Sequence, residues 1–128
     1  MLDRKDIMCK DGCGFAIFDF ILKDILEYGI GLINSVEPHN VSLSIHSACR
    51  CEKKNKEVGG MSKSYHLEGL AIDFHIDIVP LVVVEYFMRL AAEYYEVSDF
   101  IDIVVKEDYM HMEFDKRRWL KKQQEDIK

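Results

Sequence analysis

The sequence has little of what would place it among nucleic-acid-binding or membrane-spanning proteins. It carries 17 Lys and Arg against 23 Asp and Glu, which gives a net charge of -6. Nucleic-acid-binding surfaces need clustered cations to neutralise phosphates, and the two basic clusters, at 53–54 and 116–118, are short. No apolar run approaches the roughly 20 residues that a membrane helix needs. We therefore expect no nucleic-acid partner and no membrane span.

We also expect no secretory leader, and the sequence shows no repeats, low-complexity segments or linker. Residues 1–14 contain no continuous apolar stretch of the length that a signal peptide requires. We expect a protein that is cytoplasmic as synthesised. With 128 residues, 48% of them hydrophobic, the chain can bury a core as one domain over residues 1–128. The charged segment 121–128 is expected to be a frayed tail.

Cysteine is scarce, with four residues at Cys9, Cys13, Cys49 and Cys51. In a chain without a leader these are expected to be reduced thiols rather than disulfides. The spacings C-x3-C and C-x-C differ from the C-x2-C pairs that are typical of structural zinc sites. A cysteine-bound metal is thus a weak alternative, and pairing of the N-terminal segment with the loop around Arg50 is conceivable.

Hydrophobic periodicity predicts an α+β domain. Apolar residues at helical spacing indicate a helix over 15–28, ended by Gly29 and Gly31, and a helix over 80–95 that is apolar nearly all round. Alternating patterns predict strands over the ranges 41–46, 69–76, 100–105 and 109–114. The polar stretch 47–68 is expected to be a long functional loop, with a short helical turn as an alternative for part of it. This order predicts a small, mostly antiparallel sheet with flanking helices.

Three polar residues have positions that suit a metal site. Asp73 and His111 each lie on the non-core face of a predicted strand, and His66 lies at the end of the long loop. If the two strands are neighbours, these side chains converge on one surface. A catalytic zinc takes three protein ligands, usually His and a carboxylate, and keeps one position for water. An Asp in an apolar strand also needs a cationic partner, because burying it unpaired is costly.

The residues around these positions resemble the D-alanyl-D-alanine carboxypeptidase family of zinc peptidases, which is related in fold to the hedgehog signalling domain. Segment 64–73, SYHLEGLAID, matches the pattern S-x-H-x-x-G-x-A-x-D. Segment 47–50, SACR, is similar to the family's S-G-Y-R, and Asn55 followed by Val58-Gly59-Gly60 is similar to its N-x-x-V-G-G. Segment 109–113, YMHME, resembles its aromatic-x-His-x-acid strand, with Trp119 where a tryptophan often follows.

The resemblance implies a role for each matching residue. His66, Asp73 and His111 would bind one zinc per chain. Arg50 would bind the substrate carboxylate or the developing oxyanion, and Ser64 would contact the substrate. Asp108, three residues before His111, would be the general base, with Glu107 as the alternative and a mere solvated turn as the third possibility.

Two further residues lie near the predicted ligands in the sequence. Glu113 stands where an Asp is commoner, and His75 shares the strand face of Asp73. Both are predicted to support the ligands through hydrogen bonds, although a partly exposed strand histidine is the simpler interpretation of His75.

The predicted activity is zinc-dependent hydrolysis of an amide bond in peptidoglycan stem peptides, of the D-Ala-D-Ala carboxypeptidase or L-Ala-D-Glu endopeptidase type, with a zinc-bound water as nucleophile. A small single domain without a leader suits a phage- or prophage-type lysis enzyme (an endolysin), which reaches the wall once the membrane is breached. The alternatives are a non-catalytic zinc-containing module that binds the cell wall or belongs to a phage structure, and a cysteine-metal or redox protein. The last would require all four cysteines to converge.

Overall fold

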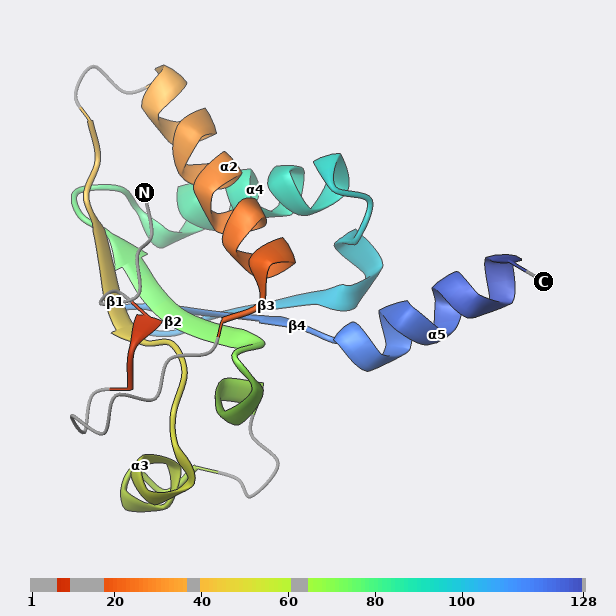
Figure 1. The fold of residues 1–128 in the computed structure, drawn as a ribbon. Coiled ribbons are helices and arrows are strands. Elements are labelled where there is room, and N and C mark those ends of the chain that lie inside the picture. Colours follow the sequence, from red (N-terminus) through yellow and green to blue (C-terminus); the bar gives the residue numbers. More distant parts are fainter. Residues whose placement is uncertain (1–6, 10–17, 37–39, 61–64, 128) are drawn as a thin grey trace.

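The computed structural model describes residues 7–9, 18–36, 40–60 and 65–127, and Figure 1 shows their arrangement. Along the chain the elements are α2 (Phe20–Val36), β1 (Leu43–Ser47), α3 (Glu52–Glu57), η1 (Tyr65–Glu68), β2 (Ala71–Ile76), α4 (Leu81–Tyr94), η2 (Ser98–Phe100), β3 (Ile101–Val105), β4 (Met110–Phe114) and α5 (Lys116–Ile127). The four strands form one antiparallel sheet in the order β1-β2-β4-β3. The predicted α+β class is therefore confirmed.

The central strands β2 and β4 bring distant parts of the sequence into register. Asp73 is paired directly with His111, and Phe74 with Met110. On the other side of β2, the pairing with β1 shifts between Ile45 and Ser47, so that Ser47 lies opposite Asp73. Such a bulge changes the direction in which a strand presents its side chains, and here it brings a hydroxyl to the position next to Asp73.

The hydrophobic core lies between the sheet and two helices. Strand residues that alternate along β2 and β4 face α2 and α4, which cover one side of the sheet, whereas α3 lies on the other side (Figure 1). Among the residues buried between them are Leu22, Ile33, Ile72, Phe74, Val84, Met88, Met110, Met112 and Phe114. Period-2 alternation thus separates an apolar face from a polar face, as the sequence pattern predicts.

Helix α2 continues past the two glycines that were expected to end it, and residues 15–17 of the expected helix lie outside the described residues. Gly29 is buried at the crossing with α4, where an added Cβ would come within 2.5 Å of Met88 Sδ. The absence of a side chain therefore lets the two helices approach closely. Gly31 meets no atom within 4 Å. The prediction was wrong because close packing, not a helix stop, requires the glycine.

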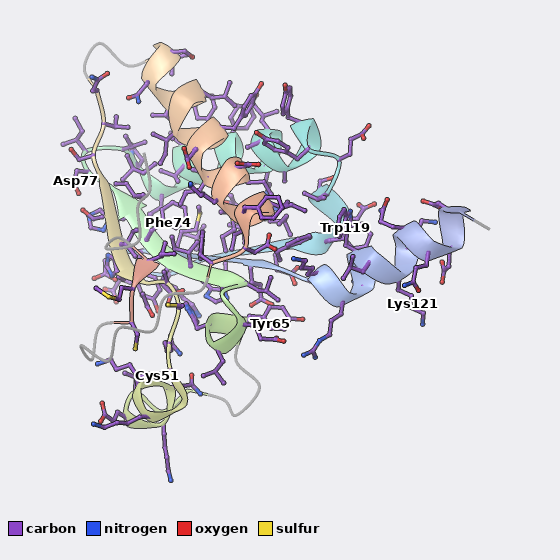
Figure 2. All side chains as sticks on the ribbon, in the orientation of Figure 1. Cys51, Tyr65, Phe74, Asp77, Trp119 and Lys121 are labelled. Carbon is purple, nitrogen blue, oxygen red and sulfur yellow. The ribbon has the colours of Figure 1, made fainter. Side chains whose placement is uncertain are left out.

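Two further helices differ from expectation. Helix α4 is buried on one face only, since Val82 and Tyr86 are 69% and 61% exposed. Residues 121–127, expected to be frayed, continue α5. This helix is anchored at its start, where Lys116 Nζ binds Asp19 Oδ1 at 2.6 Å and Trp119 packs against Phe114; Figure 2 labels Trp119 on α5. No helix among the described residues is both long and apolar enough to cross a membrane.

Candidate metal centre

His66, Asp73 and His111 converge on the polar face of the sheet. Each offers one ligand atom, and these three atoms lie within 4.8 Å of one another. Asp73 comes from β2, His111 from the adjacent β4, and His66 from η1, which leads into β2. Elsewhere among the described residues no other group of three potential ligands reaches this proximity. The predicted convergence of these residues is therefore present in the fold.

The ring of His66 is held with a defined nitrogen toward the cluster. Its Nδ1 lies 2.5 Å from the carbonyl oxygen of Ala48, and its Nε2 lies 3.4 Å from Asp73 Oδ2. Because a carbonyl oxygen can only accept, Nδ1 must carry the proton. The other ring nitrogen, Nε2, therefore faces Asp73 and the cluster. A backbone carbonyl that orients a histidine in this way is typical of metal ligands.

His111 lies between two carboxylates. Its Nδ1 donates to Asp73 Oδ1 at 2.6 Å, and its Nε2 donates to Glu113 Oε1 at 2.7 Å. The hydrogen bond to Asp73 raises the pKa of His111, opposed by partial burial and helped by the bond to Glu113. Both ring nitrogens are therefore protonated in the metal-free arrangement. If a metal took the Nδ1 position, Glu113 would still orient the ring through Nε2.

Asp73 is a buried carboxylate with three cationic or polar partners. Burial would raise the pKa of Asp73, but the hydrogen bonds and charges of His111 and His66 outweigh it and hold this pKa well below its usual range. Arg50 Nη2 adds an ion pair at 3.7 Å. Asp73 is therefore ionised at neutral pH, which is the state that a metal ligand requires.

Arg50 is fixed by contacts on every part of its guanidinium. Its Nε donates to Ser47 Oγ at 3.2 Å and its Nη1 to Asn55 Oδ1 at 3.0 Å, while Nη2 lies beside Asp73. Gly60 covers this arrangement so closely that an added Cβ would lie 2.1 Å from Asn55 Oδ1. The glycine of the V-G-G segment thus leaves room for the Asn55–Arg50 contact.

The cluster opens into a cavity of about 770 Å³. Its walls come from the loop before η1, from β4 and from the β3–β4 hairpin, and its lining residues are Arg50, Val58, Gly59, Gly60, Tyr65, His66, Asp73, Val104, Lys106, Tyr109, His111 and Glu113. Burial raises the pKa of Tyr65, with the charges of Asp115 and Glu113 adding to the effect, so its phenol is a hydrogen-bond donor at neutral pH. The cavity therefore offers cations, a donor and apolar walls.

The structure does not bring every predicted site residue to this cavity. Asp108 and Glu107 lie in the exposed turn between β3 and β4, and the described lining includes their neighbours Lys106 and Tyr109 but neither acid. His75 contacts His46 and Asp77, each at 2.7 Å, on the edge side of β2. Ser64 lies outside the described residues.

No role in the site was predicted for Tyr65, Val104, Lys106 or Tyr109, which all line the cavity. Tyr65 and Tyr109 each stand beside or near a predicted ligand histidine, and that proximity was the available signal. Val104 and Lys106 follow only from the β3–β4 pairing, which places Val104 opposite His111.

These residues fit a zinc ion. Two imidazoles and one carboxylate are a donor set that zinc takes in catalytic sites, and each histidine has an oxygen partner on its other nitrogen. The His-Asp-His cluster at an open cavity thus defines a candidate zinc site of the kind that catalytic zinc proteins use.

A model of the family described as Peptidase M15 matches residues 23–113, and the chain belongs to this family. Its members are zinc-dependent peptidases, which agrees with the predicted resemblance. A search of curated proteins and a search of solved structures each found no match.

Proposed function

We propose that this protein hydrolyses an amide bond in peptidoglycan stem peptides, of the D-Ala-D-Ala or L-Ala-D-Glu type. The observation that carries this proposal is the group His66, Asp73 and His111 at an open cavity beside a fixed Arg50. Membership of a zinc peptidase family supports peptide hydrolysis. A lysis enzyme of phage or prophage type remains our prediction for its biological setting.

His66, Asp73 and His111 would hold the metal. When bound, zinc lowers the pKa of a coordinated water and polarises a carbonyl oxygen. Asp73 is already ionised, as binding needs, whereas His66 Nε2 and His111 Nδ1 would each have to present an unprotonated nitrogen to the metal. Glu113 keeps the His111 ring in place by accepting from Nε2.

Arg50 would bind a negatively charged oxygen of the substrate. Its contacts with Ser47, Asn55 and Asp73 fix the guanidinium before a ligand arrives, and such preorganised charge stabilises a transition state without further reorganisation. Both candidate bonds lie near carboxylates in the stem peptide, so a cation beside the reacting carbonyl suits this class of substrate.

Asp108 is our proposed general base, three residues before His111. Its carboxylate would accept a proton from the attacking water. Glu113 competes for this role because it lines the cavity, although one of its oxygens already accepts from His111. Asp108→Asn should retain zinc and lower hydrolysis by roughly a hundredfold to ten-thousandfold. A larger loss in Glu113→Gln with full zinc, beside an active Asp108→Asn, would transfer the role to Glu113.

The test of the function is digestion of purified cell walls. The products distinguish the two bonds, because carboxypeptidase action releases D-alanine and endopeptidase action exposes a new D-Glu amino terminus. His111→Ala serves as the inactive control, with zinc content and circular dichroism measured alongside. Hydrolysis by the wild type that His111→Ala lacks is the expected result.

A second candidate is a non-catalytic zinc module that binds the cell wall or a phage structure. One observation favours it: neither Glu107 nor Asp108 lines the cavity. This candidate predicts a folded protein that holds zinc, sediments with purified walls and releases no product from any wall type. That combination of results would replace the proposed enzyme.

A further inference from the structure

The N-terminal segment and the loop carrying Arg50 bring two thiols together. Cys9 Sγ and Cys51 Sγ lie 3.7 Å apart although they are 42 residues apart in the sequence. Figure 2 shows Cys51 next to α3, on the side of the sheet opposite α2 and α4. We propose that Cys9 and Cys51 form a reversible disulfide when the protein meets a small-molecule disulfide such as oxidised glutathione. This proposal is independent of the peptidase activity.

Contacts other than the thiol pair hold the two segments against each other. The backbone N–H of Cys49 donates to the carbonyl oxygen of Ile7 at 3.3 Å, and the Cys49 thiol donates to the same oxygen at 2.9 Å. The N–H of Cys51 points at Cys9 Sγ, and the N–H of Lys54 points at Cys51 Sγ, each at 3.4 Å. The two sulfurs are therefore held close together in the reduced protein.

A disulfide fits the described residues better than a metal does. Cys9 and Cys51 belong to no group of three potential ligands in the described part of the chain, where only His66, Asp73 and His111 meet that condition. A bonded pair needs an S–S distance of about 2.05 Å. Side-chain rotation would have to close the remaining gap. Cys9 lies in neither a helix nor a strand, and Cys51 is the N-cap residue of α3.

The exchange balances in two steps. Cys51 is the more exposed of the pair, since Cys9 is only 2% exposed, and its thiolate attacks one sulfur of oxidised glutathione. One glutathione thiolate leaves and takes up the proton that Cys51 released. The Cys9 thiolate then attacks the Cys51 sulfur, and the second glutathione leaves and is protonated in the same way. Two cysteine thiols lose two electrons, and one oxidised glutathione becomes two thiols.

Tryptic mapping tests this pairing without ambiguity. Cleavage after Lys and Arg places the four cysteines on four different peptides, at 6–10, 11–23, 24–50 and 51–53. The full-length folded chain is equilibrated with mixtures of reduced and oxidised glutathione, alkylated, digested without reductant and analysed by mass spectrometry. The expected product is peptide 6–10 joined to peptide 51–53. Closing a 42-residue loop should also raise Tm by on the order of 10 °C.

Matched variants identify the pair. Cys49→Ser and Cys13→Ser should each keep the 6–10 to 51–53 link and the rise in Tm, whereas Cys9→Ser should lose both. Three results would overturn the proposal. They are a link that involves peptide 11–23 or 24–50, alkylation of both Cys9 and Cys51 in the most oxidising mixture, and a second zinc per chain that Cys9→Ser loses.

Discussion

The two faces of the same sheet differ in almost every physical respect. On the face toward α2 and α4, Phe74, Met110 and Met112 are fully buried against other apolar side chains. On the opposite face, neighbouring positions of the same two strands carry Asp73 and His111, which contact each other and a cavity. One face is stabilised by area removed from water, and the other by pairing of charges.

The comparison shows how this fold tolerates buried charge. An ionised carboxylate in an apolar layer would cost several kcal/mol, yet Asp73 is only 9% exposed. It is satisfied because His66, His111 and Arg50 all reach it. The polar face therefore depends on specific partners, whereas the apolar face depends mainly on volume and packing.

Removing one of the three proposed zinc ligands from the polar face should have the largest effect on zinc binding and hydrolysis. We expect His111→Ala to lose the bound zinc and all hydrolysis while the fold is kept, because the apolar face is untouched. His75→Ala is the matched control, since it lies on the same face of β2 but contacts His46 and Asp77. Elemental analysis of both purified variants is the measurement, and full zinc in His111→Ala would refute the assignment.

Removing the fixed cation should have the next largest effect. We expect Arg50→Ala to keep zinc and to lower hydrolysis by about a hundredfold or more, the usual effect of losing one transition-state donor. Arg50→Lys should recover little, because an ammonium cannot reproduce the contacts to Ser47, Asn55 and Asp73 together. Steady-state rates on stem peptides measure this, and near-normal rates in Arg50→Ala would contradict the role.

Substitutions at two glycines of α2 test how closely the helices pack on the apolar face of the sheet. Gly29→Ala should lower the free energy of unfolding by about 1–3 kcal/mol, because the new methyl group overlaps Met88. Gly31→Ala, two residues further along α2, meets nothing and should be neutral or stabilising by up to about 1 kcal/mol. Urea unfolding of the two variants compares them, with zinc content unchanged in both. Equal stabilities would show that the helices do not approach as described.

The smallest effect is the pH dependence of the metal-free protein. The hydrogen bond to Asp73 raises the pKa of His111 above its ordinary value of 6.5. Its stabilising contribution is therefore fully present below pH 6.5 and is lost as the pH rises through the raised pKa. The pKa of Asp73 is lowered from its ordinary value of 3.8, so ionised Asp73 stabilises the folded state above pH 3.8. This stabilisation is lost on acidification through the lowered pKa.

We therefore expect Tm in the presence of a chelator to fall as the pH rises from 6 to 9. The decrease should be only a few degrees, because partial exposure weakens the ion pair. His111→Asn should lack this decrease. Zinc affinity should change in the opposite direction and increase with pH, since binding displaces the His111 proton. A Tm that rises with pH in the metal-free wild type would contradict the described ion pair.

Much of the fold could be predicted from alternation in the sequence. The patterns at 69–76 and 109–114 predicted both which residues face the core and which face the candidate metal centre, because a strand has only two faces. The ends of the helices were harder to predict from the sequence. Gly29 looks like a stop signal in the sequence, and only the crossing with α4 shows why it lies inside a helix. Helix α5 could not be foreseen, because its anchors Asp19 and Phe114 come from other elements.

The convergence of His66, Asp73 and His111 could be predicted because a sequence motif and a strand pattern pointed to the same residues. The cavity walls could not, because they depend on pairings across the sheet. Lys106 and Val104 reach the site only through the β3–β4 hairpin. The contact between Cys9 and Cys51 likewise depends on how two irregular segments dock, for which a sequence carries no periodic signal.

The pairing of Asp73 with His111 has a consequence for the order of folding events. These residues are 38 positions apart, and β2 and β4 can pair only after the chain between them, including α4, has closed as a loop. Pairings of this separation are intrinsically slow to form, because their entropic cost comes before any contact compensates it, and we expect this one to follow helix formation. The cluster of His66, Asp73 and His111 therefore cannot assemble in a chain that has folded only locally. The rate at which refolding protein withdraws zinc from a coloured chelator should consequently follow the formation of the central strand pair, and not the earlier appearance of helix.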